Sequence, residues 1–344
     1  MNPTLESKNE ELVLEAFDTL VTSREAVRVE AVLGLAAKQK SLPPWLFYDA
    51  IGSGFFEQIT ELPEYYLTRT ERALLAKHSD EILELVSAGK SVSISELGAG
   101  TATKTGILLQ MAVCRQESVL YQPIDVCEVS LDAARENIHQ RIPGVTVLPQ
   151  VSNYVTEQIR IERHAGNKVL ALCIGSSIGN FLPDERIRIL RSLRDALEPE
   201  DCLLLGTDLA PGQHKSLSEL FAAYDDLEGV TAKFNLNLLT RLNREIGTDF
   251  NPGLFRHLIR WNAEESRIEM HLESLVQQEV TVPAGLDEME LRIGFYEGET
   301  IHTENSYKFN TRTINEMLTA AGFSVMRVWT DTLQTFAVTL AAAR

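Results

Sequence analysis

Residues 94–106, ISELGAGTATKTG, combine an acid, two glycines and the start of a helix-like segment. An apolar run ends at Glu96, and Gly98 and Gly100 follow with one residue between them. Glycines between a strand and a helix let a ligand approach bare backbone, and the helix N-terminus attracts negative charge. This pattern predicts a loop that binds a nucleotide-like molecule.

The spacing of the glycines distinguishes between cofactors. A dinucleotide fingerprint needs a third glycine where this chain has Thr103. An acid two residues before the first glycine instead gives the E-x-G-x-G form of S-adenosylmethionine (SAM) methyltransferases, in which the acid helps to place the amino acid end of SAM. Asp125 ends the next predicted strand, 27 residues after Gly98, where a carboxylate accepts hydrogen bonds from ribose hydroxyls. NAD enzymes also use an acid there, so it is the loop that favours SAM.

Strands and helices that alternate along residues 71–210 must position these groups. Short apolar runs predict strands at SVSISEL, VLYQPIDV, GVTVLPQV, KVLALCIG and DCLLLGTD. Helical segments separate them, including 155–164 and DERIRILRSLRDALE, which Asp184 is expected to cap. Strands that alternate with helices in this way predict an α/β fold with a doubly wound parallel sheet.

The alternation ends after residue 210. Two helices are predicted next, with a boundary at Gly229, and residues 264–284 and 289–296 alternate as antiparallel strands do. A helix ending at Gly322 and two strands that could pair, FSVMRVWTD and FAVTLAAA, complete the chain. Residues 1–40 have helical periodicity.

The composition argues against several classes of function. The 344 residues include 49 acidic and 32 basic side chains, a net charge of −17, so neither nucleic acid nor an anionic membrane is an expected partner. The four cysteines include no C-x-x-C, and the seven histidines show no metal-binding spacing, so no metal site is expected.

The N-terminus lacks a signal-peptide apolar region, and no apolar run approaches the roughly 20 residues that span a bilayer. We therefore expect a cytoplasmic monomer.

Several runs, in this order along the chain, resemble one family: SLPPWLFYDAIGSGFFEQITELPEYYLTRTE, ELGAGTATKT, CIGSSIGN, LLLGTDL, AYDDLEGVTAKFN, NREI, RIEMHL and ENSYKF. It is the histidine-specific N-alpha-methyltransferase family, which makes hercynine from L-histidine in ergothioneine biosynthesis. The resemblance implies a Rossmann-like SAM-binding domain (71–210 and 309–344) and an inserted α+β substrate-binding domain (1–70 and 211–308). It also implies the transfer of three methyl groups from SAM to the α-amino group of L-histidine.

On the cofactor side, the resemblance implies that Gly98 lies beside SAM, Lys104 near its carboxylate and Asp125 on the ribose. The family has an acid followed by an aromatic residue where the adenine lies, and this chain has Asn153 and Tyr154 there. An Asn can contact the adenine amino group through its carbonyl, and the Tyr can flank the ring. The departure at Asn153 puts that one contact in question.

On the substrate side, the resemblance implies that Tyr65, Asn180 and Tyr224 bind the carboxylate and amino groups of the amino acid. Glu304 would accept a hydrogen bond from one imidazole nitrogen and Ser306 would serve the other. The remaining residues implied to line the pocket are Tyr48, Phe56, Gly175 and Met270. We assign the catalytic part to Asn180 and to Tyr48, which helps the amine proton to leave through water. Aromatic faces also suit a trimethylammonium product.

Two other functions remain open at this stage. A methyltransferase of the same fold could act on another aromatic amino acid or on an indole amine, and only the ring-facing pair Glu304 and Ser306 favours histidine. A non-catalytic SAM-binding protein would have no reason to keep the matched set of Tyr65, Asn180, Tyr224 and Glu304.

Overall fold

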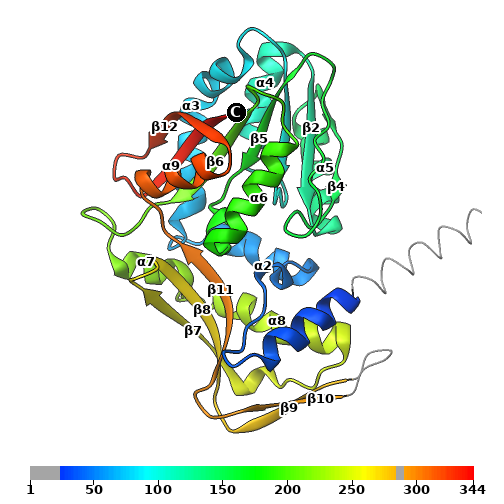
Figure 1. Cartoon of the computed structure of the whole chain (residues 1–344), viewed down its shortest axis with the longest axis vertical. Coiled ribbons are helices and arrows are strands. Elements are labelled where there is room, and N and C mark those ends of the chain that lie inside the picture. Colours follow the sequence, from blue (N-terminus) through cyan, green and yellow to red (C-terminus); the bar gives the residue numbers. More distant parts are fainter. Residues whose placement is uncertain (1–23, 284–289) are drawn as a thin grey trace, which may run out of the picture. The chain divides into compact units, whose positions relative to one another are not determined.

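The computed structural model of the chain describes residues 24–283 and 290–344. An eight-stranded sheet has the order β12-β13-β6-β5-β1-β2-β3, with β4 beside β2 (Figure 1). The strands are β1 (Val92–Leu97), β2 (Val119–Asp125), β3 (Val145–Val147), β4 (Gln150–Val151), β5 (Lys168–Cys173), β6 (Cys202–Asp208), β12 (Phe323–Thr330) and β13 (Phe336–Ala343). Strand pairs among β1 to β6 are parallel, whereas β13 is antiparallel to both β6 and β12. The predicted doubly wound α/β sheet and the C-terminal strand pair are confirmed.

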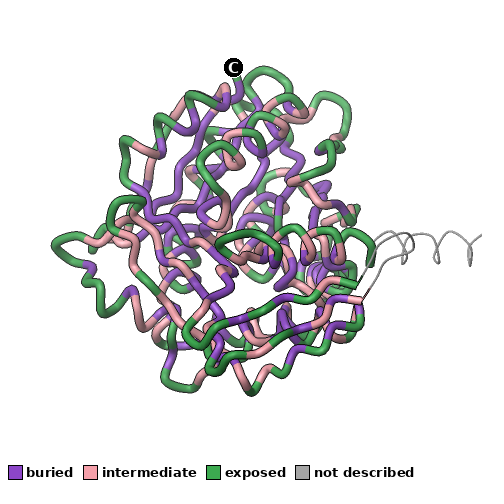
Figure 2. The backbone as a smooth tube through the Cα atoms, turned by 60° about the horizontal axis from the view of Figure 1, so that its bottom comes forward, coloured by how far each residue is buried: buried purple, intermediate pink, exposed green. Residues whose placement is uncertain are grey.

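Helices cover both faces of this sheet because its strands are apolar on both sides. The inward side chains Val169 and Ala171 of β5 and Leu203 of β6 share one core cluster with α6 (Pro183–Asp195) and α9 (Thr311–Ala320). Alternate β5 residues point the other way, and α3 (Tyr66–Ser87) contacts β1, β5, β6 and β13 as well as α4 (Gly106–Gln116). Helix α5 (Glu128–Arg141) packs on β2 and β3. In Figure 2 the purple, buried stretches run inside, and green marks the outer loops.

The described residues divide into two compact units. The first, which holds the central sheet, comprises residues 48–231, 259–269 and 305–344. The second comprises residues 24–47, 232–258, 270–283 and 290–304. The other elements are η1 (Pro44–Phe47), α2 (Ala50–Glu61), η2 (Ser177–Asn180), α7 (Leu217–Tyr224), α8 (Val230–Ile246), η3 (Pro252–Leu254), β7 (Phe255–Asn262), β8 (Arg267–Ser274), β9 (Gln278–Val282), β10 (Leu291–Phe295) and β11 (Thr300–Tyr307). The limits predicted for the SAM-binding and substrate-binding domains differ from the limits of these two units, and the two domains stay a prediction.

Several local predictions are confirmed, and some element limits differ. Gly229 separates α7 from α8, and Gly322, with φ +88°, follows α9. Of the predicted helical stretch 1–40, residues 24–36 are helical and residues 1–23 lie outside the described residues. Helix α6 begins at Pro183 with Leu182 as its N-cap, so Asp184 lies in the first turn and the predicted Asp184 cap is wrong.

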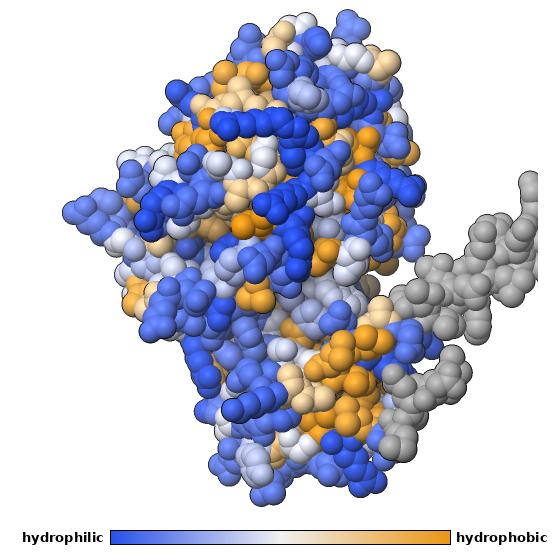
Figure 3. Space-filling model, in the orientation of Figure 1, coloured by the Kyte–Doolittle hydropathy of each residue, from blue (hydrophilic) through white to orange (hydrophobic). Residues whose placement is uncertain are grey.

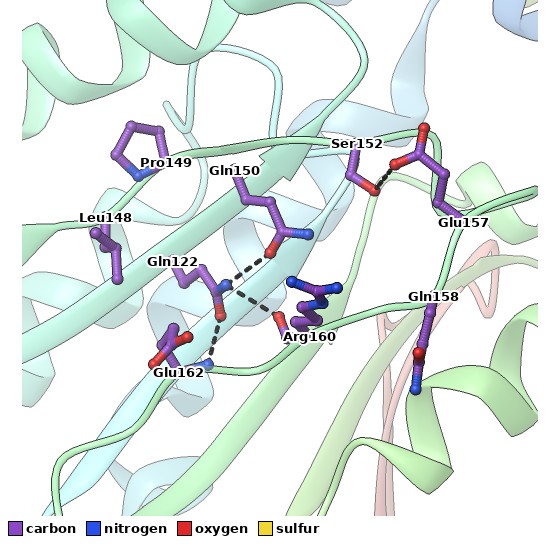
Figure 4. Close-up of a pocket in the computed structure, with 9 residues that line it drawn as sticks. All are labelled: Gln122, Leu148, Pro149, Gln150, Ser152, Glu157, Gln158, Arg160 and Glu162. Atoms are coloured by element: carbon purple, nitrogen blue, oxygen red, sulfur yellow. Dashed lines mark hydrogen bonds between the residues drawn. The ribbon is translucent and has the colours of Figure 1, made fainter.

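The predicted helix at 155–164 is wrong, because this segment forms turns and irregular backbone. Gln122, buried in β2, holds it: its amide donates to the Arg160 carbonyl at 3.0 Å and accepts from the Glu162 N–H at 2.9 Å. Backbone groups bonded to Gln122 are not available to a helix. Figure 4 shows these bonds beside an open pocket of about 630 Å³. None of the predicted site residues lines this pocket.

The outer surface agrees with the acidic composition. Hydrophilic residues cover most of the face seen in Figure 3. Within the described part of the chain, none of the helices is both long and apolar enough to cross a bilayer.

Glu96 at the end of β1 fixes the glycine loop from the inside. Its carboxylate accepts hydrogen bonds from the Thr105 hydroxyl at 2.6 Å and from the Tyr121 hydroxyl at 2.5 Å. Thr105 directly precedes α4 and Tyr121 lies in β2. The Glu96 carboxylate of β1 therefore bonds to both the start of α4 and the neighbouring strand β2. Burial raises the pKa of Glu96 to about 7.

This pKa predicts a pH dependence of stability. Because the folded protein binds the Glu96 proton more tightly than the unfolded chain, the contribution of Glu96 to the free energy of unfolding is greatest below its unfolded pKa of 4.5 and falls as pH rises to about 7. Glu96→Gln keeps a neutral acceptor. From pH 5 to pH 8, we expect the free energy of unfolding of the variant to rise by roughly 1–3 kcal/mol relative to that of wild type, measured by urea unfolding. Glu61→Gln, at an exposed position, serves as control. If the free energy of unfolding of Glu96→Gln changes with pH in parallel with that of wild type, the prediction is wrong.

Candidate active site

Four aromatic side chains predicted for the substrate pocket lie in a row within the first compact unit. Tyr48 meets Phe56 edge-on, with 5.7 Å between ring centroids. Phe56 meets Tyr65 at 6.4 Å, and Tyr65 meets Tyr224 at 6.2 Å, again edge-on. Such edge-to-face pairs attract one another. The structure therefore brings together four of the predicted residues that are spread over more than half of the sequence.

Helix ends position these rings. The Asp49 side chain caps the first turn of α2, which places Tyr48 just outside that helix. Tyr65 is itself the N-cap residue of α3. Helix α7 begins with a capping box between Ser216 and Glu219 and ends at Tyr224. Three of the four rings thus lie at helix ends, where side chains from different segments can meet, whereas Phe56 lies within α2.

The row ends in a pair of hydroxyl groups. Tyr224 Oη lies 2.8 Å from Ser306 Oγ of β11. The buried ammonium of Lys308 donates to both oxygens, at 2.7 Å to Tyr224 and 2.8 Å to Ser306. Ser306, predicted to serve the imidazole, therefore shares one hydrogen-bonded cluster with Tyr224, predicted to bind the amino acid end.

Asp208 supports this cluster from the end of β6. Its buried carboxylate pairs with Lys308 Nζ at 2.8 Å and with Lys215 Nζ at 2.5 Å. The hydroxyl of Tyr66, the first residue of α3, donates to both Asp208 oxygens at 2.9 Å. Burial lowers the pKa of Lys215 to about 8, and the neighbouring Asp208 opposes that shift. Burial, together with Asp208, raises the pKa of Tyr66 well above its ordinary value.

The predicted cofactor loop is held against the end of β2 by hydrogen bonds from two of its glycines. Gly98, with φ +67°, donates its N–H to the Ile124 carbonyl at 2.8 Å, and Gly100 donates to Asp125 Oδ2 at 2.9 Å. A Cβ at Gly98 would lie 3.2 Å from the Tyr154 hydroxyl, so only glycine leaves this space open. Gly98, Asp125 and Tyr154 are thus brought together as predicted. Burial raises the pKa of Asp125, whereas backbone N–H groups lower it.

Lys104 and Gly175 also meet. Lys104 Nζ pairs with the buried Glu71 carboxylate at 2.6 Å, and the Gly175 N–H donates to both oxygens of that carboxylate at 2.8 and 2.9 Å. Gly175 has φ +80°, and a Cβ there would lie 2.9 Å from Lys104 Nζ. A residue predicted for the cofactor and one predicted for the substrate are therefore joined by Glu71.

The other predicted residues lie at less informative places. Asn153 Oδ1 accepts from the Val155 N–H at 3.2 Å, so the carbonyl expected at the adenine already makes a local turn. Asn180 is half-buried at the end of η2, after β5. Glu304 of β11 and Met270 of β8 are both buried in the second compact unit, and their roles stay predictions. On β11, Glu304 and Ser306 are two residues apart and share a face of the strand.

Sequence reasoning missed the four buried charged residues of these two clusters, which are Glu71, Asp208, Lys215 and Lys308. A signal existed for Glu71, since it occupies a position on the buried stripe of α3 with Leu67 and Leu74. A charge on an apolar helix stripe needs a partner. Asp208 likewise ends an otherwise apolar strand, where doubly wound folds place functional groups.

Known proteins support the same family. The family described as "Histidine-specific methyltransferase, SAM-dependent" matches residues 27–343. The chain is 40% identical, over 93% of its length, to the Histidine N-alpha-methyltransferase of Mycolicibacterium smegmatis, of which it covers 96%. It is 27% identical, over 85% of its length, to Ergothioneine biosynthesis protein 1 of Neurospora crassa, of which it covers 32%.

Among solved structures, the magnesium protoporphyrin IX methyltransferase of Synechocystis with bound SAH superimposes with a TM-score of 0.43 at 14% identity. That match covers 87% of this chain and 97% of the other, and at this score it adds no weight. The sequence matches extend over nearly the whole chain and include both the glycine loop and the aromatic row. This chain belongs to the family of SAM-dependent, histidine-specific methyltransferases.

Proposed function

We propose that this protein transfers three methyl groups from SAM to the α-amino nitrogen of L-histidine, giving hercynine for ergothioneine biosynthesis. The observation that carries the proposal is the 40% identity to the M. smegmatis Histidine N-alpha-methyltransferase over almost the full length of both chains. Further support comes from the site, where aromatic rings and neutral hydroxyls suit a small zwitterion with a polar ring.

The substrate side of the proposal uses the row of Tyr48, Phe56, Tyr65 and Tyr224. The faces of these rings can stabilise an ammonium group that gains methyl groups in each round and keeps a permanent charge after the third. Tyr65 and Tyr224, with Asn180, bind the carboxylate and amino groups. Neutral groups of this kind fix orientation without competing with the charges of the amino acid.

The imidazole end of the substrate is assigned to Glu304 and Ser306, with Met270 against the ring and Gly175 beside the amine. Glu304 accepts the N–H of the ring. A buried carboxylate left without that N–H is costly, so rings that lack it are rejected.

The residues of the glycine loop fit a bound SAM. Gly98 leaves a space that a Cβ would narrow, the Asp125 carboxylate lies at the end of β2, and the Lys104 ammonium lies next to the loop. We propose that Gly98 lies beside SAM, that Asp125 binds its ribose and that Lys104 lies near its carboxylate, with Asn153 and Tyr154 at the adenine. SAM supplies an electrophilic methyl group on a sulfonium.

The residues of the chain then have to present an unprotonated amine. Asn180 and Tyr65 orient it toward the methyl carbon, at the roughly 3 Å separation that an in-line displacement needs. Before each transfer the ammonium form of the substrate loses one proton through water that Tyr48 orients. The nitrogen–carbon bond then forms as the carbon–sulfur bond breaks. Each round yields one S-adenosylhomocysteine and one proton, and the third yields the trimethylammonium.

A direct test is to incubate the purified protein with SAM and all twenty amino acids and to analyse the products by mass spectrometry. We expect a trimethylated product of histidine and of no other amino acid. A methylated product of tryptophan or tyrosine would show that histidine is not the substrate, although the reaction would still be a SAM-dependent methyl transfer. SAM binding without any product would favour an untested amine, such as an indole amine, or the non-catalytic alternative.

We also propose that the protein acts as a cytoplasmic monomer and needs no nucleic acid partner. Light scattering during gel filtration should give the mass of one chain, and a dimer mass would contradict the first part.

The contact between Gly175 and Lys104 generates a prediction about SAM. Gly175→Ala forces a residue with a side chain to adopt φ +80° and places its Cβ against Lys104 Nζ. We expect the Kd for SAM to rise at least tenfold, measured by calorimetry. Gly166→Ala is the matched control, since Gly166 has φ +85° but nothing within 4 Å of the added Cβ. Equal SAM affinity of the two variants would remove Lys104 from the cofactor site.

The role of Glu304 gives a second prediction. Glu304→Gln keeps the size of the side chain but removes the charge that accepts the ring N–H. A charge-assisted hydrogen bond contributes about 1.5–3 kcal/mol, so the KM for histidine should rise roughly 10- to 100-fold. The Kd for SAM should stay within about twofold, and the exposed Glu297→Gln should change neither constant. An unchanged KM in Glu304→Gln would exclude Glu304 as the imidazole acceptor.

A further inference from the structure

The Lys308 ammonium lies within hydrogen-bond distance of three acceptor oxygens. An ammonium has three hydrogens to donate and cannot accept. Those of Lys308 face Asp208 Oδ2 at 2.8 Å, Tyr224 Oη at 2.7 Å and Ser306 Oγ at 2.8 Å. The side chain is fully buried, so no water competes for these bonds.

This arrangement sets the direction of the hydroxyl hydrogens. Because Lys308 can only donate, both Tyr224 Oη and Ser306 Oγ must accept from it. One hydroxyl hydrogen is used in the 2.8 Å bond between the two oxygens. The other hydroxyl hydrogen must therefore point away from Lys308. The ammonium thus directs this second hydrogen away from itself, and donation from a cation strengthens the bond that this hydroxyl makes.

Asp208 explains why a charge can remain at this position. A buried ammonium without a partner is costly, and the Asp208 carboxylate pairs with Lys308 and with Lys215. Lys215 provides an internal comparison. Among the described residues its hydrogen bonds go to Asp208 Oδ1 and to the Leu209 carbonyl, both at 2.5 Å. Both lysines are buried and share the same carboxylate, but it is Lys308 that reaches the hydroxyl pair.

We propose that Lys308 is a positioning residue that makes the Tyr224–Ser306 pair a hydrogen-bond donor to the substrate. The inference rests on the proposed function, in which these two hydroxyls contact histidine. A donor at this point requires an acceptor on the ligand, which is a carboxylate oxygen or the unprotonated nitrogen of a neutral imidazole. Lys308 thereby selects the chemical class of group that can occupy the site, without touching it.

The test compares Lys308→Met with Lys215→Met in the full-length protein. Methionine removes the ammonium in each case, leaves one lysine on Asp208 and keeps the length of the side chain. In Lys308→Met we expect the KM for histidine to rise at least tenfold, kcat to change less than threefold and the Kd for SAM to stay within twofold. In Lys215→Met we expect the KM for histidine to stay within twofold, although its thermal midpoint falls.

Two further variants separate positioning from a general loss of structure. Lys308→Gln replaces the charge by an amide and serves if Lys308→Met does not fold. Ser306→Ala is combined with each Lys308 variant, and we expect the two effects on KM to be clearly less than multiplicative, because Lys308 acts through Ser306. A SAM Kd within twofold of wild type shows that a variant is folded.

The outcomes are distinguishable from those of the proposed function. No trimethylation of histidine by the wild-type protein would overturn the proposed function and this inference with it. Turnover by wild type, with equal rises in KM for Lys308→Met and Lys215→Met, or with an unchanged KM in every folded Lys308 variant, would overturn this inference alone. Multiplicative effects of Lys308 and Ser306 would do the same.

Discussion

Asp208 ends β6 with its carboxylate fully buried, and three segments of the chain converge on it. Tyr66 brings the start of α3, Lys215 the loop before α7, and Lys308 the residue after β11. Removing one partner of a buried ion pair costs about 3–5 kcal/mol, because the other charge stays unpaired. This carboxylate therefore helps to fix the positions of Tyr65, which precedes Tyr66, and of Tyr224, which bonds to Lys308. These two rings form one end of the aromatic row.

A second buried acid, Glu71, joins separate segments of the chain beside the glycine loop. Glu71 of α3 pairs with Lys104 and accepts the Gly175 N–H, so one carboxylate joins α3, the segment before α4 and the turn after β5. Space for it exists because β6 has Gly206 there, where a Cβ would lie 1.9 Å from Glu71 Oε1. Tyr66 and Glu71 both belong to α3, so this helix carries both clusters. In the proposed reaction this shared support holds the donor and acceptor of the methyl group at a fixed separation.

Much of the fold could be predicted from local pattern. Apolar runs such as KVLALCIG form strands with both faces covered. The glycine loop, through Gly100, meets Asp125 because parallel strands end at the same edge. The pattern failed at 155–164, where Gln122 of a distant strand holds the backbone. A side chain that lies 38 to 40 residues away leaves no trace in the periodicity of the segment itself.

The sequence by itself determined the order of strands and helices, the glycine loop and the family, because these depend on residues close together in the chain or on long runs of matched letters. Only the tertiary structure decided which charges pair. Asp208 and Lys308 are 100 residues apart, and Glu71 and Lys104 are 33 apart. Nothing in the spacing of these residues says that they meet, because contact depends on strand order and on how α3 packs against the sheet. Yet their burial requires that they do, since a lone charge in this interior would be too costly to keep.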